Sequence, residues 1–529
     1  MVLPFENKGS AEDEYFADGI TNDIIDRLLN IRGLHVISAM PNKREQVAEQ
    51  MAEEEDVDYF LQGTVKKEQL TDPNSEVRIT LQLTKVSDHR IVWRERYENN
   101  PIEAQSEIVK QVPRELEIAL LKHEQRALAY LPTSNIEAYD FYLRGEGHFR
   151  RRVGRNLAMA IEMYDEAVKL DPGFALAYCR LSMCHSWMYW FAHDHSQKRI
   201  DMAKKAVETA SEHDPDLPEV HQAWGRYYYL GHRNYSVALE KLYTALENQP
   251  HNSDVISFIG FIQRRQGKFE EALDTIEKAS ELQPLSSILV KEVASTLEEL
   301  GRYEEAESCY DRAIRLAPRE SRVYYYKARL YLSWEGRTDK ARQVLNEALQ
   351  KIDAIRSTSG MTSALAELDV YERDYQGALD RLSSEPNDFR LRRAQIYEYM
   401  GKNKEAKELY GQARDFLESK IAEDPNDERF HSSLGIAYAG LGHNEEAIRE
   451  GELAVDLLPV TKDAGAGPDR IRDLARIYVM VGKHDDAIDQ LDFLSHLPGG
   501  VSKPLLRLDP AWDPLRDHSD FKKLVESGK

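Results

Sequence analysis

The sequence has few of the features that mark secreted, metal-binding or membrane proteins. It contains only three cysteines in 529 residues, Cys179, Cys184 and Cys309. Their spacing suggests no metal site, and so few cysteines in so long a chain exclude a disulfide framework, so we expect buried thiols. No run of about 18 apolar residues is present, and the N-terminus lacks a basic stretch followed by an apolar one. The sequence therefore predicts no metal site and no membrane insertion by this chain.

Positive charge is also scarce. The chain has 70 lysines and arginines against 92 aspartates and glutamates, which gives a formal net charge of −22. Such a surface repels polyanions over long range, so attraction to nucleic acid or to an anionic membrane is disfavoured. The sequence therefore predicts no nucleic-acid partner for this chain.

Catalytic motifs are missing as well. The patterns Gly-x-Ser-x-Gly and His-Glu-x-x-His do not occur, and no glycine loop of the phosphate-cradling type is present. Aspartate and glutamate are so abundant that chance pairs of carboxylates carry no weight. The sequence therefore predicts a protein that is not an enzyme and has no cofactor.

A repeat of 34 residues dominates what is present. The small residues Gly260, Ala294 and Ala328 follow one another at intervals of 34, which is the period of a tetratricopeptide repeat (TPR). Each is followed by an alanine, then a large apolar or aromatic residue, then a second alanine. Further copies, some with insertions, bring the array to about ten units. They centre on Gly145, Ser182, Gly225, Ala366, Ala394, Gly435 and Ala475.

These residue types have a packing explanation. The two helices of a unit cross closely at the small residue, so a larger side chain would separate them. Glycine ends the first helix of a unit, and proline ends the second. The pattern predicts a mostly α fold, a right-handed TPR solenoid with an N-terminal block at residues 126–353, a C-terminal block at residues 354–500 and a capping tail at residues 501–529. A Ser/Thr/Gly stretch at residues 355–361 predicts a bend or break between the blocks.

One insertion interrupts the repeat. Between Ser182 and Ala203 the chain has nine residues more than the template allows. The inserted segment contains the aromatic residues Trp187, Tyr189, Trp190 and Phe191. They either pack a lengthened helix pair or form a patch for a partner. A metal site of His185, His193 and His195 is disfavoured, because histidines two positions apart on a helix point apart and no cysteine completes the set.

Residues 1–125 lack the repeat and predict a small α/β domain. We expect Asp18 or Thr21 to cap the first helix, rather than to form a metal or phosphate site with Asp23. The alternation of apolar and polar residues in 77–86 is typical of a half-buried strand. The expected strands are 2–6, 34–39, 59–66, 77–86 and 91–96, and the expected helices are 18–31, 43–55 and 103–123.

Several segments of this first domain resemble the TolB amino-terminal-like domain. They include Leu-Pro-Phe-Glu-Asn (3–7), Tyr-Phe-Ala-Asp-Gly-Ile-Thr-Asn-Asp-Ile (15–24), Gln-Gly-Thr-Val (62–65) and Ile-Val-Trp-Arg-Glu-Arg-Tyr (91–97). The resemblance implies a bacterial signalling protein in which this domain precedes a TPR array. In that family the pair commonly follows a winged-helix domain, a Ser/Thr kinase or a nucleotide cyclase. Because the chain begins almost inside a predicted strand, we expect an upstream segment in the native gene.

The inner, concave face of the array is the expected ligand surface. Helix positions that line this face in a TPR carry five basic residues, an unusual number for so acidic a chain. A groove of this kind would clamp carboxylates or an acidic peptide through arginine forks. The alternative is a solvated face balanced by Glu219, Asp254 and Glu298. The predicted binding residues are Arg226, Tyr229, Phe261, Arg264, Lys291, Arg322, Tyr325 and Arg329.

Together these patterns predict a non-catalytic scaffold or sensor that binds a protein or peptide segment. Two alternatives stay open. The chain can be an envelope assembly factor that self-associates, which a long unpaired edge strand at residues 59–66 or 77–86 would favour. The α/β domain can also hold an unrecognised catalytic or small-ligand site. The resemblance places such modules in the periplasm where a membrane helix precedes them and in the cytoplasm otherwise.

Overall fold

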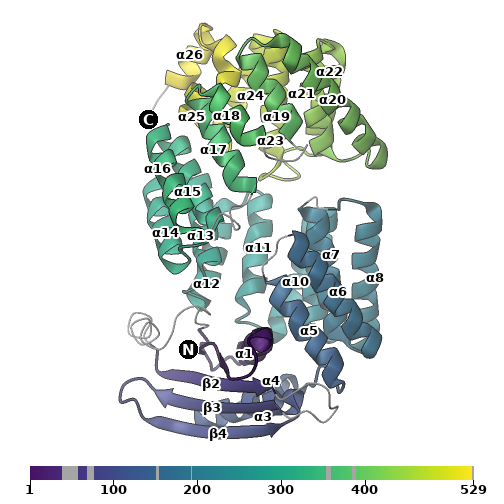
Figure 1. The fold of residues 1–529 in the computed structure, drawn as a ribbon, viewed down its shortest axis with the longest axis vertical. Coiled ribbons are helices and arrows are strands. Elements are labelled where there is room, and N and C mark those ends of the chain that lie inside the picture. Colours follow the sequence, from purple (N-terminus) through teal and green to yellow (C-terminus); the bar gives the residue numbers. More distant parts are fainter. Residues whose placement is uncertain are drawn as a thin grey trace. The chain divides into compact units, whose positions relative to one another are not determined.

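The computed structural model describes residues 1–37, 57–67, 77–150, 154–191, 194–352, 359–383 and 389–526 (Figure 1). The chain divides into two compact units. Unit 1 comprises Met1–Ile262 and Lys278–Leu285, and unit 2 comprises Gln263–Glu277 and Ser286–Lys529. Among the described residues, no helix is both long and apolar enough to cross a membrane.

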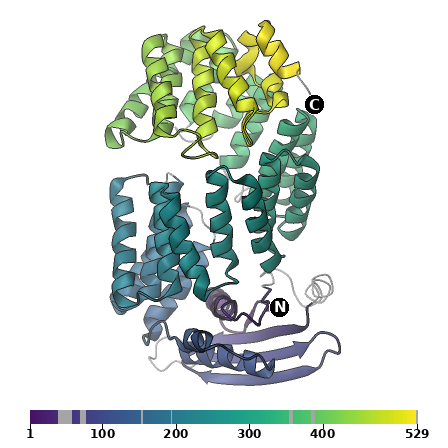
Figure 2. The same ribbon diagram turned by 180° about the vertical axis from the view of Figure 1, so that it is seen from behind.

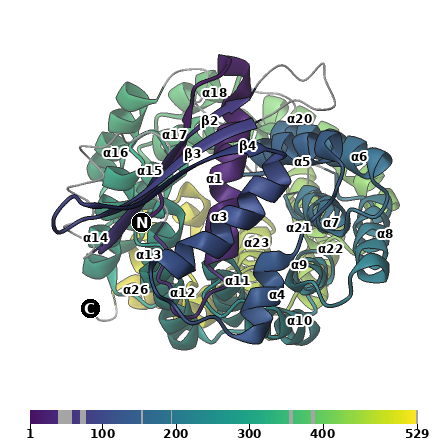
Figure 3. The same ribbon diagram turned by 90° about the horizontal axis from the view of Figure 1, so that it is seen from below.

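A four-stranded mixed sheet begins unit 1. Strand β1 (Glu6–Asn7) pairs parallel with β2 (Tyr59–Lys67), and β3 (Val77–Lys85) pairs antiparallel with β2 and with β4 (Ile91–Asn99). Val77 and every second residue up to Leu83 are buried, as the alternation predicts. These side chains share one hydrophobic core with α1 (Glu14–Leu28) and α3 (Pro101–Glu115), which lie beside the strands (Figure 3). A short helix, α4 (Lys122–Ala129), leads on to the array.

The start of α1 differs from the sequence prediction. Ser10 caps a 3₁₀ turn at Ala11–Asp13, and α1 follows it directly, so Asp18 lies inside the helix and is not its cap. The Thr21 hydroxyl instead donates to the Ala17 carbonyl (2.8 Å) and accepts from the Phe5 amide (3.0 Å). The capping prediction was therefore wrong for both residues.

Two other predicted elements near the N-terminus have different outcomes. Residues 34–37 form no strand, although the Ile37 carbonyl accepts a hydrogen bond from the Val2 amide (2.8 Å). The predicted strand at 2–6 is reduced to a bridge between Val2 and Leu61 and to β1. The predicted helix at 43–55 lies outside the described residues, as does most of the predicted break at 355–361.

Helix pairs make up the rest of both units, and the predicted fold class, a TPR solenoid behind a small mixed sheet, is confirmed. In unit 1 they are α5 (Ile136–Phe149), α6 (Gly154–Leu170), α7 (Ala175–Trp190), α8 (Gln197–His213), α9 (Pro218–Arg226), a π-helical turn (Tyr227–Gly231), α10 (Tyr235–Asn248) and most of α11 (Ser253–Arg265). The residues of α12 (Phe269–Leu282) are divided between the units.

Unit 2 continues the array and ends in a tail. Its helices are α13 (Ser287–Glu299), α14 (Tyr303–Leu316), α15 (Ser321–Trp334), α16 (Thr338–Lys351), α17 (Ser359–Tyr371), α18 (Tyr375–Ser383), α19 (Arg390–Tyr399), α20 (Asn403–Glu423), α21 (Glu428–Leu441), α22 (Asn444–Leu457), α23 (Gly467–Met480) and α24 (His484–Ser495). The tail consists of α25 (Lys503–Leu508), a 3₁₀ segment (Pro510–Leu515) and α26 (Ser519–Glu526), drawn in yellow in Figure 2.

The tail caps the last repeat. Trp512 is only 2% exposed and shares a core with Leu474 of α23 and Leu491 of α24. Other tail side chains pack elsewhere in unit 2, since Leu505 and Leu508 lie against the core formed by α15, α16 and α17. The tail therefore joins the end of the array to α15.

The small residue of each repeat marks a close helix crossing. At Gly435 of α21, an added Cβ would lie 2.6 Å from Ile477 Cδ1 and 2.9 Å from the Ala447 carbonyl oxygen. At Gly411 of α20, an added Cβ would meet nothing within 4 Å. The two positions therefore form a matched pair of helical glycines in unit 2.

We expect opposite effects from alanine at these two glycines. Gly435→Ala should destabilise unit 2 by about 1–2 kcal/mol, because the crossing must widen by more than the gain in helix propensity offsets. Gly411→Ala should stabilise it by about 0.5–1 kcal/mol, because only the propensity changes. Thermal unfolding of the two variants in parallel measures this, and equal stability would contradict the close crossing.

Candidate ligand-binding surfaces

The predicted binding residues of unit 1 are engaged inside the unit. The Arg226 side chain is 2% exposed, forms an ion pair with Asp254 and lies 4.4 Å above the Phe258 ring. Tyr229 is buried in the π-helical turn, and Phe261 packs partly buried against the core. These three side chains therefore contribute to packing, and a ligand-binding role for them stays a prediction.

The aromatic insertion extends α7 and packs largely within unit 1. Trp187 stacks on Phe191 at 5.0 Å between ring centroids, and Trp190 lies 5.4 Å from Tyr229. Tyr189 stacks on His195 at 3.6 Å. His185 is buried, and its Nδ1 lies 2.9 Å from Arg199 Nη1, whereas His193 lies outside the described residues. The packing interpretation accounts for these contacts, and the partner patch stays a prediction.

A buried polar cluster joins the α/β domain to the first repeat. Lys67, at the end of β2, donates to Asp140 Oδ1 of α5 (2.5 Å) and to the Tyr15 hydroxyl of α1 (2.8 Å). The Asp140 side chain also accepts from Tyr15 (2.8 Å) and from Arg144 Nε (2.9 Å). Burial lowers the pKa of Lys67, and Asp140 opposes that shift. Three elements thus share one buried ion pair.

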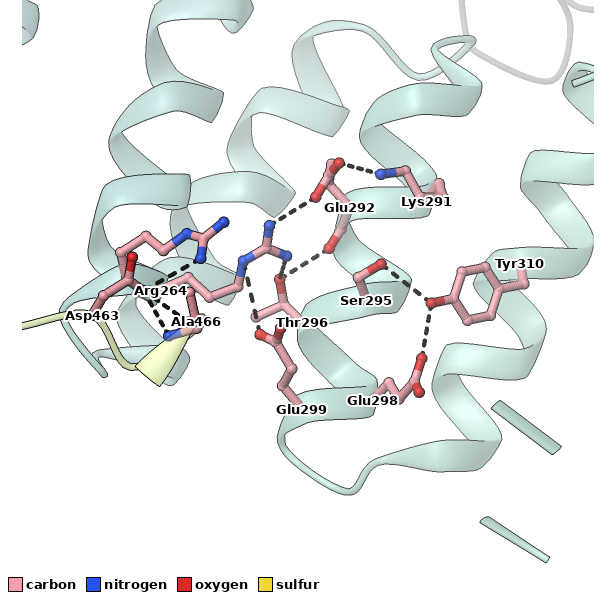
Figure 4. A network of polar contacts seen from close by, with 12 residues as sticks. Arg264, Lys291, Glu292, Ser295, Thr296, Glu298, Glu299, Tyr310, Asp463 and Ala466 are labelled. Carbon is pink, nitrogen blue, oxygen red and sulfur yellow. Dashed lines mark hydrogen bonds and ion pairs between the residues drawn. The ribbon is translucent and has the colours of Figure 1, made fainter. Parts of the chain in front are cut away.

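In unit 2, Arg264 lies at the centre of a polar network (Figure 4). It donates to Glu292 Oε2 (2.9 Å) and to Thr296 Oγ1 (3.2 Å), and its Nε lies 3.8 Å from Glu299. Lys291 pairs with the same Glu292. Burial raises the pKa of Glu292, but Lys291 and Arg264 outweigh it and hold that pKa at about 2. The structure thus brings two predicted binding residues together on one carboxylate.

The neighbouring Arg265 contacts a distant segment of unit 2, the turn that precedes α23. Its Nη1 lies 3.3 Å from Asp463 Oδ1, and its carbonyl accepts from the Ala464 amide (2.7 Å). Asp463 Oδ1 also accepts from the amides of Gly465 (2.9 Å) and Ala466 (3.0 Å) (Figure 4). This contact joins residues 198 apart in the chain. Sequence reasoning missed it, because the 34-residue period describes neighbouring repeats only.

The remaining predicted residues lie on α15. Arg322 is exposed and pairs at 3.3 Å with Glu320 in the preceding turn, so it does not join the others. Arg329 lies 5.9 Å above the Tyr325 ring. The Arg329 side chain is exposed. Desolvation lowers its pKa, but Tyr325 and Glu298 outweigh that effect, so the pKa is raised.

Further arginines lie on the first helices of the C-terminal repeats. Sequence reasoning did not select them. Arg476 of α23 lies 3.2 Å from Asp509 of the tail, and Arg472 lies 2.7 Å from Asp469. Arg392 of α19 lies 3.9 Å from Glu367 of α17. The template could have found them, because all three lie on first helices of repeats.

Two family models match parts of this chain. Residues 284–351 match the model described as tetratricopeptide repeat. The array is built of tetratricopeptide repeats. Residues 1–112 match the model described as HilA/YgeH-like transcriptional regulator, second domain. The chain is thus similar to a regulator domain in its first unit, whereas its likeness to the TolB amino-terminal-like domain stays a prediction.

One curated relative is a protein of Rhizobium meliloti (strain 1021) named "Putative adenylate cyclase 3". It is 28% identical over 223 residues, which are 39% of this chain and 37% of that protein. The match thus spans little more than a third of the relative's length.

Solved structures resemble parts of the array. A tetratricopeptide repeat protein from Parabacteroides merdae is 20% identical over 51% of this chain and 99% of its own (TM-score 0.36). A thermophilic TPR protein from Thermus thermophilus is 16% identical over 37% and 99% (TM-score 0.32). The human IFIT1 dimer with m7Gppp-AAAA is 14% identical over 68% and 77% (TM-score 0.39). TM-scores this low carry no argument about ligands.

Proposed function

We propose that this chain is a non-catalytic scaffold or sensor module of a bacterial signalling or regulatory system. One observation carries the proposal: a single chain combines TPR repeats with a domain similar to part of HilA/YgeH-like transcriptional regulators. The curated relative, named as a cyclase, fits a signalling context. In this proposal the repeats bind a protein or peptide segment, and the α/β domain of residues 1–125 docks a second partner or a small ligand.

The contacts in the structure change which residues we expect to bind the peptide partner. Arg226 and Arg264 hold internal ion pairs, so their loss would disturb the fold as well as any ligand. Arg329 is exposed on α15 and forms no ion pair within 4.0 Å among the described residues. We therefore assign the central role in partner binding to Arg329 and Tyr325.

Selection from a displayed library of short peptides tests this proposal. The full chain should enrich acidic sequences, and Arg329→Glu should weaken binding of the selected peptide by about tenfold or more, through loss of a charge-assisted hydrogen bond and added repulsion. Arg322→Glu is the matched control on the same helix, and it should bind as the unaltered chain does. Enrichment of no common sequence, or equal loss in both variants, would contradict the proposal.

Two other functions have less support. An assembly factor was expected to expose an edge at β2 or β3, but both strands are interior to the sheet, and the edges of the described sheet are β1 and β4. The charged residues Arg94, Arg96 and Glu98 along β4 are typical of an edge that resists pairing with another chain. In the described part of residues 1–125, the buried polar groups of Lys67 and Tyr15 are engaged with each other and with Asp140 of α5, so they give a catalytic α/β domain no specific support. Self-association and location in cytoplasm or periplasm stay open.

A further inference from the structure

Four arginines gather on the inner face of unit 2, and we name them the arginine cluster: Arg329, Arg392, Arg472 and Arg476. They come from α15, α19 and α23, which belong to repeats far apart in the sequence. Consecutive first helices of a TPR array line the same concave surface, so these helices face one interior. The cluster is thus a product of the superhelix and not of one helix.

The tail brings the two ends of this interior together. Leu505 and Leu508 pack against the core of α15, α16 and α17, whereas Trp512 packs with α23. Arg373, which follows α17, donates to the Leu508 carbonyl (2.8 Å) and to Asp513 Oδ1 (2.9 Å). The tail therefore contacts α15, the end of α17 and α23, and links these parts of unit 2.

The four arginines of the cluster differ in how closely a carboxylate pairs with each of them. Asp509 pairs with Arg476, Asp469 with Arg472, and Glu367 lies at the longer distance of 3.9 Å from Arg392. Arg329 forms no ion pair within 4.0 Å among the described residues, although the charges of Glu298 and Glu367 help to raise its pKa. Asp473 is already engaged by Ser432 (2.8 Å) and by Arg470 (3.6 Å).

The guanidinium groups of the cluster have more N–H donors than their ion pairs use. A guanidinium offers five N–H donors, and each of these ion pairs uses only one or two. The Nε of Arg476 is buried and has no hydrogen-bond partner among the described residues. A buried donor without a partner costs free energy, so an acceptor placed there would be stabilised.

Like charges also crowd one another here. Burial lowers the pKa of Arg472, whereas the carboxylates of Asp469 and Asp473 raise it, and the net shift is upward. The positive charges of Arg476 and Arg329 act in the opposite direction and lower it. Arg329 and Arg476 therefore lie close enough to Arg472 to repel it. An anion bound near these groups would relieve this repulsion.

We propose that the arginine cluster binds the phosphate group of a small anionic ligand. Phosphate carries up to two charges and several acceptor oxygens, which suits several convergent guanidinium groups better than a single carboxylate does. The inference rests on the proposed role of the repeats as a binding array, and it adds a ligand class and a place of binding.

Calorimetric titration of the full chain with inorganic pyrophosphate in metal-free buffer tests the inference. The unaltered chain should bind, and Arg329→Gln should weaken the affinity by about tenfold or more, because one charged donor group is removed. Arg414→Gln is the matched control, since Arg414 lies on the outer helix α20 and pairs with its neighbour Asp415. It should bind pyrophosphate like the unaltered chain.

Further arms separate the alternatives. Potassium chloride at equal ionic strength should compete only weakly, because chloride carries one charge and cannot accept the paired hydrogen bonds that a guanidinium donates to phosphate oxygens. Tighter binding of succinate than of pyrophosphate would overturn the phosphate assignment, as would equal affinity in Arg329→Gln. Circular dichroism checks that this variant folds, and Arg472→Gln, which alters a partly exposed pair, should lose affinity likewise.

The peptide selection described above keeps the two proposals apart. A chain that enriches acidic peptides but does not bind pyrophosphate would refute this inference alone. A chain that binds pyrophosphate but enriches no peptide would refute the proposed function and leave this inference standing.

Discussion

Replacement of Asp140 by alanine is expected to destabilise unit 1 by about 3–5 kcal/mol, the usual cost of leaving one partner of a buried ion pair without the other. Asp140 and Lys67 have side chains that are 6% and 3% exposed. Without Asp140, the Lys67 ammonium keeps no carboxylate nearer than Asp13 (3.9 Å) among the described residues, and its other contacts are the Tyr15 hydroxyl (2.8 Å) and the Phe16 ring (4.7 Å). The junction between β2, α1 and α5 should therefore open first.

Hydrogen–deuterium exchange in increasing urea measures this effect, because it follows β2 and α5 separately from unit 2. Removal of the stranded charge in the double variant Asp140→Ala with Lys67→Met should recover much of the lost stability. Glu166→Ala is the surface control, since its pair with Lys169 is largely exposed, and it should change stability by less than about 1 kcal/mol. Equal protection in Asp140→Ala and the unaltered chain would show that the pair is dispensable.

Trp512→Ala is expected to destabilise the C-terminal repeats of unit 2 by about 3–5 kcal/mol, the range for truncating a buried large aromatic side chain. Trp512 is buried in the core that α23 and α24 share with the tail, and Arg476 lies 6.0 Å from its ring. The loss should leave a cavity at the capped end of the array and expose α23 to water. It should also release Leu505 from its contact with the core at α15.

Phe493→Ala provides the control for this truncation. Phe493 lies on α24 in the last repeat but is 49% exposed, so its removal should change stability by about 0.5 kcal/mol or less. Thermal unfolding combined with exchange at α23 and α24 should separate the two variants. If Trp512→Ala unfolds like Phe493→Ala, the tail does not cap the array.

Sequence periodicity predicted the parts of this fold that depend on neighbours along the chain. Gly435 and Ala447 show why, because they lie at the crossing of two consecutive helices, and such a crossing recurs at the same positions of each repeat. The alternation in β3 likewise predicted which of its side chains are buried. The same reasoning placed Trp512 in a cap.

Contacts over longer distances could not be read from the period. The contact of Arg265 with Asp463 depends on small rotations between repeats, summed over the many repeats that separate them. The ion pair of Arg226 with Asp254 was equally hidden from the period, so a residue predicted to contact a ligand is buried in unit 1, and its binding role stays a prediction.

Two signals in the sequence were nevertheless available. Lys67 continues the inward-facing positions Leu61 and Val65 of β2, and a lysine at such a position indicates a buried acidic partner. The early start of α1 was also signalled, because Ser10 precedes the acidic turn at Glu12 and Asp13. The capping prediction failed because it counted apolar spacing and not these polar residues.

The position of the tail has a consequence for synthesis on the ribosome. At roughly 5–20 residues per second, α23 is complete some seconds before Trp512 is added. During that interval Leu474 and Leu491 have no cover from the tail, and the contact of Leu505 with α15 does not exist. Nascent chains arrested between α24 and the tail should therefore recruit chaperones that recognise apolar surface, and should release them once the tail has left the ribosome.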